Sequence, residues 1–215
     1  MFKTISMDPP WPEFGGGKIK RGAQAHYGLI RTKEEILRVI LQATSPCMVF
    51  DPIGRPMQTE RGVWQPDPEG CLLWMWATRN HLPMAFWLIE ALGFRYVTDF
   101  VWVKGGPLRQ LIIEGGRLSQ DSLKQLRGVV KLAKGGLGQW STSQHEHLLM
   151  ARIGKVDKPA PQDRMPSVIV APREEHSVKP AVFYDWMEKL GPEGPRLEMF
   201  ARGPQEGWTV WGDQA

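Results

Sequence analysis

The feature that most constrains the fold is an unbroken apolar run at residues 71–77, which reads CLLWMWA. A strand with one face in water alternates apolar and polar side chains, whereas a strand covered on both faces is apolar throughout. The run therefore predicts an interior strand of a sheet whose two faces are both covered by other elements.

Predicted strands alternate with predicted helices along the rest of the chain. The strands are expected at residues 2–8, 71–77, 96–104, 146–152, 167–171, 196–201 and 208–211, and the helices at 33–43, 81–92 and 180–190. This alternation is typical of the α/β class, with an open, mostly parallel sheet and helices on both faces. Ligands of such sheets bind beyond the carboxyl ends of the strands, where the strand order reverses.

The composition fits one globular domain over residues 1–215, with 42% hydrophobic and 23% charged residues. Two inserts are expected in it, at about 44–69 and 105–138. The first is rich in proline and reads as an irregular excursion with a short strand near 48–50. The second is bounded by glycines and contains a predicted helix at 120–133, with Ser119 as its N-cap.

Several properties of the chain limit its location and partners. No apolar stretch approaches the ~20 residues of a membrane-spanning helix, so we expect no membrane association. The first residues run straight into a predicted strand, and we therefore expect no removable signal peptide. Cys47 and Cys71 form neither a disulfide framework nor a zinc pattern, which fits the reducing cytoplasm. The net charge of +4 suits a polyanion-binding surface, although many proteins without such a partner share it.

Residues 8–11, directly after the first predicted strand, read Asp-Pro-Pro-Trp. Because proline has no backbone N–H, Pro9 and Pro10 leave main chain that offers only carbonyl acceptors. The Asp8 carboxylate and the Pro9 carbonyl can each accept one hydrogen of an exocyclic amino group, and Trp11 offers a face on which a base stacks. The alternative is a proline-rich turn after an edge strand, with Trp11 in the hydrophobic core.

This motif resembles the catalytic motif of amino-methyltransferases that use S-adenosylmethionine, and its Trp form resembles the MT-A70-like adenine-N6 branch. Further segments similar to that family follow in the family's order, at residues 73–78, 93–94, 100–104, 145–149, 176–180, 197–202 and 207–214. Together they cover most of the chain outside the two inserts. The resemblance implies a Rossmann-like methyltransferase fold with a circularly permuted motif order, since the acceptor motif comes first and the cofactor strand last.

The resemblance also implies a reaction: transfer of a methyl group from S-adenosylmethionine to N6 of adenine in nucleic acid. We favour DNA over RNA because the sequence carries no appended RNA-binding module such as a zinc-finger array. One alternative is a catalytically silent nucleic-acid-binding subunit, although such partners have a degenerate motif. The other is a protein glutamine N-methyltransferase, which would resemble Asn-Pro-Pro-Tyr at this place. We expect a monomer or a homodimer.

The resemblance carries a set of site residues with it. The catalytic residues are Asp8, Pro9, Pro10 and Trp11, and the cofactor-binding residues are Asp8, Ser177, Lys179, Glu198, Phe200, Arg202, Asp213 and Gln214. Carboxylates and amides suit the vicinal hydroxyls of a ribose, and Arg202 suits the cofactor carboxylate. The sequence departs from the family at Asp213, where the family usually has Asn. Part of the family's cofactor-adenine pocket lies before the first strand, and we expect that contact to be supplied otherwise or lost.

The expected substrate contacts lie in three regions. They are Tyr27, Glu146, the basic residues Lys18, Lys20 and Arg21 near the motif, and Lys124, Arg127 and Lys131 in the second insert. The resemblance implies that Tyr27 helps to frame the acceptor adenosine, the alternative being a turn with a half-buried tyrosine. It also implies that Glu146 lines the acceptor pocket. His145 and His147 share one strand face, but no third ligand lies near them in sequence, and we expect no metal.

The second insert generates a prediction about nucleic-acid binding. Lys124, Arg127 and Lys131 recur at spacings of three and four, so on a helix they share one face, as phosphate contacts require. Neutralising the three cations should reduce the log–log salt dependence of binding by up to ~3 units while cofactor affinity stays the same. An unchanged salt slope would assign the insert to a lid or to dimer contacts instead.

Overall fold

The computed structural model describes residues 1–12, 32–43, 62–105, 143–171 and 179–212, and the backbone of short strands at 49–50, 56–57, 113–114 and 117–118. These residues form a sheet of nine strands in the order β3-β2-β11-β10-β1-β4-β8-β5-β9. The strands of this sheet are β1 (Thr4–Met7), β2 (Val49–Phe50), β3 (Pro56–Met57), β4 (Gly70–Ala77), β5 (Arg95–Lys104), β8 (His145–Gly154), β9 (Val168–Ala171), β10 (Arg196–Met199) and β11 (Thr209–Trp211). A separate pair joins β6 (Ile113–Glu114) to β7 (Arg117–Leu118).

Most of the large sheet is parallel. β1 pairs in parallel with β10 on one side and β4 on the other, β11 continues the parallel set beyond β10, and β9 runs parallel to β5. β8 lies antiparallel between β4 and β5, and the short β2 is antiparallel to β11. The predicted α/β fold with an open, mostly parallel sheet is therefore confirmed.

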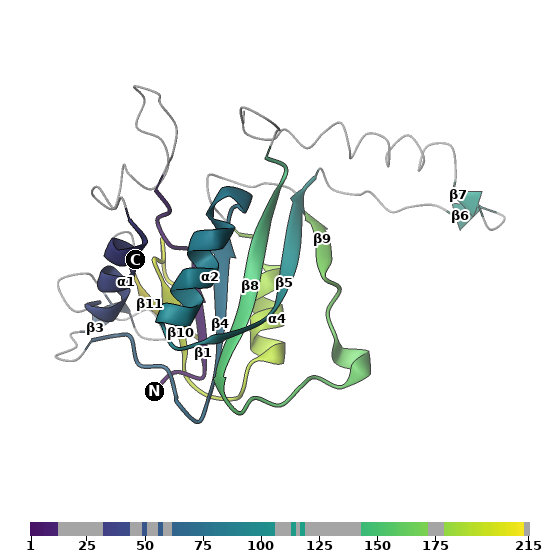
Figure 1. Ribbon diagram of the computed structural model, residues 1–215. Coiled ribbons are helices and arrows are strands. Elements are labelled where there is room, and N and C mark those ends of the chain that lie inside the picture. The colour runs from purple at the N-terminus through teal and green to yellow at the C-terminus, as the bar shows by residue number, and fades with distance from the viewer. Residues whose placement is uncertain are drawn as a thin grey trace, which may run out of the picture.

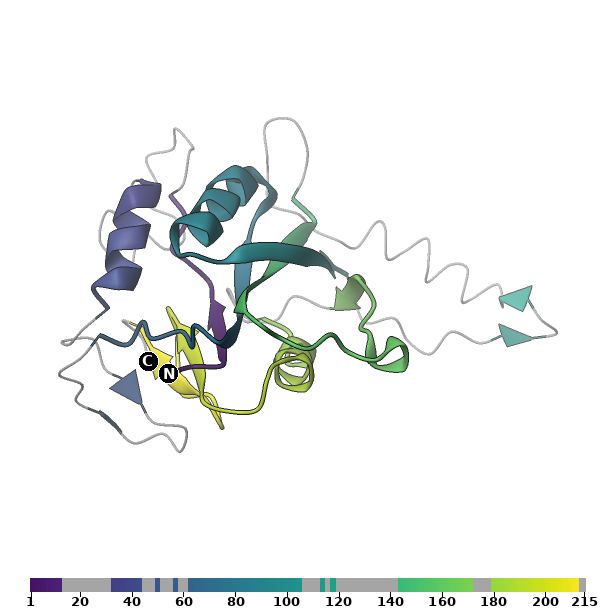
Figure 2. The same cartoon turned by 60° about the horizontal axis from the view of Figure 1, so that its bottom comes forward.

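Helices cover both faces of this sheet (Figures 1 and 2). The helices α1 (Lys33–Leu41) and α2 (Leu82–Ala91) lie on one face, and α4 (Val182–Leu190) lies on the other. Successive side chains of a strand point to opposite faces, and β4 is buried along its whole length, so it serves both cores. Leu73 and Met75 pack in the core beneath α1 and α2, whereas Trp74 and Trp76 pack in the core beneath α4.

The local signals for α1 and α2 agree with the structure. Thr32 caps α1 as predicted, since its hydroxyl accepts from the Glu35 N–H at 3.2 Å while the Glu35 carboxylate accepts from the Thr32 N–H at 3.3 Å. This reciprocal pair is a capping box, which satisfies two donors at the start of the helix. Gly93 follows the C-cap of α2 with φ +81°, a conformation that glycine adopts without strain.

Some predicted boundaries shift and others fall outside the described residues. The helix expected at 180–190 begins at Val182, because a turn in which the Phe183 N–H donates to the Pro180 carbonyl precedes it. The short strand expected near 48–50 is β2. The helix expected at 120–133 and its cap lie outside the described residues. Within the described part of the chain, no helix has the length and apolarity needed to cross a membrane.

The end of β8 makes a close backbone approach that generates a stability prediction. Gly154 pairs with Gly70 and has φ +65°, and a Cβ at this position would lie 2.3 Å from the Glu69 carbonyl group. Gly154→Ala should therefore lower the free energy of unfolding by at least about 1–3 kcal/mol, measured by urea denaturation. The matched control is Gly203→Ala, where a Cβ meets nothing within 4 Å. Equal denaturation midpoints for the two variants would contradict the strained close approach.

Candidate active site

The sheet brings the two expected motifs to one edge. Asp8 follows β1 directly, and Arg202 follows β10 by three residues. Because β1 and β10 are parallel neighbours, their carboxyl ends meet at the same edge of the sheet. β8 is antiparallel, so its beginning lies at this edge too, and it places Glu146 near the ends of β4 and β5. The strand order therefore gathers an acidic residue from each of β1 and β8 and a cation after β10.

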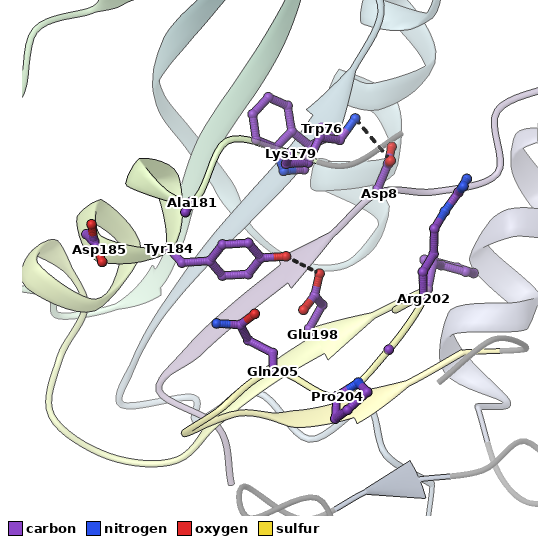
Figure 3. A pocket seen from close by; sticks show the side chains of 12 residues that line it. Asp8, Trp76, Lys179, Ala181, Tyr184, Asp185, Glu198, Arg202, Pro204 and Gln205 are labelled. Carbon is purple, nitrogen blue, oxygen red and sulfur yellow. Dashed lines mark hydrogen bonds and ion pairs between the residues drawn. The ribbon is translucent and has the colours of Figure 1, made fainter. Parts of the chain in front are cut away.

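A hollow of about 480 Å³ opens at this edge (Figure 3). Its walls come from the ends of β1, β4 and β10, from the first turns of α4 and from the loop after β10. The charged and aromatic side chains that line it include Asp8, Trp76, Lys179, Tyr184, Glu198 and Arg202. The volume is within the usual range of small-molecule sites, which is ~300–1,000 Å³.

Alternating charges connect Asp8 to β5 and β8. The Lys179 ammonium lies 3.1 Å from Asp8 Oδ2 and 2.7 Å from Glu146 Oε2. Glu146 also accepts a hydrogen bond from Lys104 through its other oxygen. The same Lys179 ammonium lies 4.7 Å from the centre of the Trp76 ring, which adds a cation–π contact. Lys179 is thus held by two carboxylates and an aromatic face at the mouth of the hollow.

Burial and neighbouring charge act in opposite directions on these groups. Burial raises the pKa of Asp8, and the attraction of the Lys179 ammonium only partly offsets this effect. Burial also acts to raise the pKa of Glu146, but the two ammonium groups outweigh it and leave that pKa below its usual value. For Lys179, burial acts to lower the pKa, and the carboxylates of Asp8 and Glu146 raise it overall. Lys179 therefore stays charged, and Glu146 stays ionised between its two cations.

A second polar pair lines the hollow. The Tyr184 hydroxyl, in the first turn of α4, donates to Glu198 Oε1 on β10 at 2.7 Å (Figure 3). Burial raises the pKa of Glu198 to about 7, although the hydrogen bond from Tyr184 opposes that rise. Burial likewise raises the pKa of Tyr184, which keeps its hydroxyl protonated as a donor. Near neutral pH this carboxyl group can therefore either donate or accept a hydrogen bond.

The turn after β10 is strained and forms one wall of the hollow. Phe200 has φ +63°, a left-handed conformation that is uncommon for a bulky residue and costs of the order of 1–3 kcal/mol. Phe200 is buried, with its ring edge-on to Trp211. The turn then presents Arg202 and Gln205 to the hollow. Strain of this kind persists where the surroundings impose it, and it is concentrated at functional sites.

The polar groups of the hollow match the parts of S-adenosylmethionine. Glu198 and Gln205 have the oxygens and amide hydrogens that pair with ribose hydroxyls. Arg202 and Lys179 are the cations suited to the methionine carboxylate, and the rings of Phe200 and Tyr184 supply apolar surface. The charged, hydrogen-bonding and apolar groups of the hollow therefore match the chemical groups of S-adenosylmethionine.

Trp11 corrects one expectation. Its side chain is only 8% exposed, its ring stacks on His81, and its indole N–H donates to the Trp76 carbonyl at 2.9 Å. An indole whose face is already covered offers no open surface to an incoming base. In this structure Trp11 is therefore a core residue, which is the alternative that the sequence left open.

The structure adds residues that sequence reasoning missed and leaves others undescribed. The residues missed are Trp76, Lys104, Tyr184 and Gln205. Lys104 ends β5, and Trp76 lies one residue before the end of β4, so the predicted strand boundaries already placed both at the active edge. Tyr184 and Gln205 carry no comparable signal. The expected site residues outside the described part are Lys18, Lys20, Arg21, Tyr27, Lys124, Arg127, Lys131, Ser177, Asp213 and Gln214. Among the described residues, no group of three or more His, Cys, Asp or Glu side chains could hold a metal ion.

The fold and the hollow define a class of protein. The sheet is open and mostly parallel, and the antiparallel β8 lies between β4 and β5. An acidic motif follows β1, and a strained turn follows β10. These features are those of a Rossmann-like methyltransferase domain with permuted motif order. A family model described as MT-A70 matches residues 123–214.

Individual relatives agree with this match. The Type II methyltransferase M.MunI of Mycoplasma sp is 25% identical over 98% of this chain and 76% of its own length. The N(6)-adenosine-methyltransferase MT-A70-like of Arabidopsis thaliana is 29% identical over 66% of this chain but only 18% of its own length. The N6-methyladenosine RNA methyltransferase MTA1 of Cryphonectria parasitica is 23% identical over 100% of this chain and 52% of its own length. The chain is therefore similar to MT-A70-like adenine-N6 methyltransferases, both in the segment matched by the family model and along the alignments with these relatives.

The raised pKa of Glu198 generates a prediction about stability. In the folded protein the pKa is about 7, against a usual 4.5, so between these values the folded state binds more protons than the unfolded state. The contribution of Glu198 to the stability of the wild type therefore falls as pH rises from about 4.5 to above 7. Glu198→Gln lacks this titration and should exceed the wild type in unfolding free energy at pH 8, by up to about 3 kcal/mol, with no such gain at pH 5.

The measurement is urea denaturation of the ligand-free protein at several pH values. Glu206→Gln, which removes a carboxylate from an exposed position, is the control for a general loss of negative charge. A gain for Glu198→Gln that is the same at pH 5 and pH 8 would contradict the proposed burial of the charge.

Proposed function

We propose that this protein transfers a methyl group from S-adenosylmethionine to N6 of adenine in nucleic acid, with DNA favoured over RNA. The observation that carries the proposal is the position of Asp8. Its carboxylate stands at the end of the central strand β1 and opens on the hollow that contains Glu198 and Arg202. The Asp8 carboxylate, which can accept a hydrogen bond from an amino group, therefore lies next to a pocket large enough for a cofactor.

The chemistry requires a better nucleophile than free adenine provides, because the N6 lone pair is delocalised into the ring. Asp8 uses Oδ2 for Lys179, and a carboxylate has further acceptor positions for one N–H of the amino group. The Pro9 carbonyl accepts the Trp11 N–H at 2.8 Å, and its second lone pair is suited to the other N–H. Two acceptors favour a tetrahedral nitrogen with a localised lone pair, which stabilises the transition state more than the ground state.

S-adenosylmethionine supplies an electrophilic methyl group on its sulfonium when it is bound. Lys179 and Arg202 would hold its carboxylate, and Glu198 and Gln205 its ribose, which aims the methyl group at the Asp8 side of the hollow. Ser177, Asp213 and Gln214 belong to the same proposed set through the family resemblance. Orientation at about 3–3.5 Å between reacting atoms supplies much of the rate enhancement in such transfers.

The proposal also names nucleic-acid contacts, of which Glu146 lies in the described part of the chain. Glu146 and Asp8 both pair with the Lys179 ammonium. This position of Glu146 beside Asp8 supports its proposed role in a wall of the acceptor pocket. The proposal also includes Tyr27 and two basic groups, which are Lys18, Lys20 and Arg21 near the motif and Lys124, Arg127 and Lys131 in the second insert. In a duplex, the adenine must leave the stack to reach Asp8. We propose that the protein acts in the cytoplasm as a monomer or homodimer.

Two observations bear on the substrate and on the alternatives. The fungal relative is named for RNA, so the RNA hypothesis needs a direct test. The presence of Asp8 in a polar hollow is evidence against a catalytically silent subunit, whose motif would be degenerate. Asp at position 8, where a protein glutamine methyltransferase would have Asn, is evidence against that second alternative.

The test is labelled methyl transfer to matched DNA and RNA oligonucleotides, single- and double-stranded, and to a protein fraction. Mapping of the modified base by mass spectrometry should find N6-methyladenine in DNA above RNA. Labelled RNA above DNA would reverse the substrate preference, and labelled glutamine would establish the protein methyltransferase. No transfer to any acceptor, with the labelled cofactor still bound, would favour the silent subunit.

Removing the Asp8 carboxylate should separate catalysis from cofactor binding. Asp8→Ala should lower turnover at least ~10²–10³-fold, the usual effect of losing a hydrogen-bond partner of the transition state. Its dissociation constant for S-adenosylmethionine, measured by calorimetry, should stay within a few-fold of the wild type. Asp163→Ala, which removes an exposed carboxylate paired with Lys189, is the control and should keep full turnover. Near-normal turnover of Asp8→Ala would eliminate the mechanism.

A further inference from the structure

The segment after Asp8 has few means of holding its own backbone in place. Residues 9, 10 and 12 are prolines and lack an N–H, so Trp11 has the only backbone donor between Pro9 and Pro12. That donor is used inside the segment, on the Pro9 carbonyl at 2.8 Å. Any anchoring of this segment to the sheet must therefore come through its carbonyl groups or its side chains.

His81, at the junction between β4 and α2, provides such an anchor. Its Nε2 lies 2.7 Å from the Pro12 carbonyl oxygen, and its Nδ1 lies 2.8 Å from the Thr78 hydroxyl. A carbonyl oxygen only accepts, so Nε2 must carry the hydrogen. In the neutral imidazole Nδ1 is then an acceptor, and the Thr78 hydroxyl donates to it. Thr78 thereby selects the tautomer that binds Pro12.

Trp11, the residue before Pro12, is held at the same junction. The Trp11 ring stacks on the His81 ring with 5.6 Å between centroids and 12° between planes. The Trp11 indole N–H donates to the Trp76 carbonyl at 2.9 Å, and His81 itself is only 9% exposed. One buried imidazole therefore contacts two consecutive residues of the segment, one by stacking and the other by a hydrogen bond.

We propose that His81 is a positioning residue for methyl transfer, which clamps Trp11 and Pro12 and so fixes the Asp8 carboxylate and the Pro9 carbonyl. This inference rests on the proposed function. The His81 ring has no role in the chemistry and acts only through the segment. Because a displacement of ~1 Å can reduce a rate about 100-fold, loss of the clamp lowers turnover without removing any group that reacts.

The test compares two substitutions that both replace the imidazole ring by an amide but place that amide at different distances from the backbone. The amide nitrogen of His81→Gln takes approximately the place of Nε2 and can still donate to Pro12, whereas that of His81→Asn takes approximately the place of Nδ1 and cannot. We expect His81→Gln to keep turnover within about threefold of the wild type and His81→Asn to lose about 10- to 100-fold. The cofactor dissociation constant should be the same in both variants. Equal turnover of the two variants would overturn the proposal.

A spectroscopic measurement tests the clamp independently of activity. Imidazole ¹H–¹⁵N spectra of the wild type should show His81 protonated at Nε2, with its signals identified by nuclear Overhauser contacts to the stacked Trp11 ring. Protonation at Nδ1 would overturn the proposal even if both variants failed to fold.

A wild type that methylates no acceptor would contradict the proposed function but would still allow the clamp to be judged. In that case, solvent exchange of the Trp11 indole N–H provides the comparison. Faster exchange in His81→Asn than in His81→Gln would support the clamp, and equal rates would overturn it.

Discussion

The position of β1 between β10 and β4, with parallel pairing on both sides, is the constraint on which the site depends. Register pairs Met7 with Met199 and with Met75, so three strands reach the active edge at the same level. β1 has only four residues, all of them buried, and cannot slide without exposing apolar side chains or losing both ladders. Asp8 is therefore delivered next to the turn after β10 by backbone pairing rather than by any contact of its own side chain.

The charges at that edge are arranged so that none is buried without a partner. Lys179 lies between Asp8 and Glu146, and Glu146 lies between Lys179 and Lys104. Removing a charge from water costs several kcal/mol, and paired carboxylates and ammonium groups offset part of that cost. The same arrangement keeps Asp8 beside a cation before any ligand binds, so that an acceptor amino group meets a carboxylate that is already oriented. Glu198 differs from these groups, because the partner that it has among the described residues, Tyr184, is neutral and burial raises its pKa.

Local sequence signals predicted the elements better than the contacts between them. The continuous apolar run gave the interior strand β4, and Thr32 with Glu35 gave the start of α1, because strand burial and helix capping depend on neighbouring residues in the chain. Trp11 was open to two interpretations from sequence, stacking surface or core. His81, 70 residues away, decided between them by covering the indole ring. No local pattern contains that contact.

The sequence by itself determined the class of fold, the resemblance to a family and the chemical identity of the acceptor motif, since these follow from apolar periodicity and from side-chain types in a fixed order. Tertiary structure decided which groups meet. Glu146 joins Asp8 through Lys179, Tyr184 pairs with Glu198, and His81 holds Pro12. Each of these contacts connects different elements at the carboxyl edge of the sheet. Their geometry follows from strand order and register, which arise only when the whole sheet has formed.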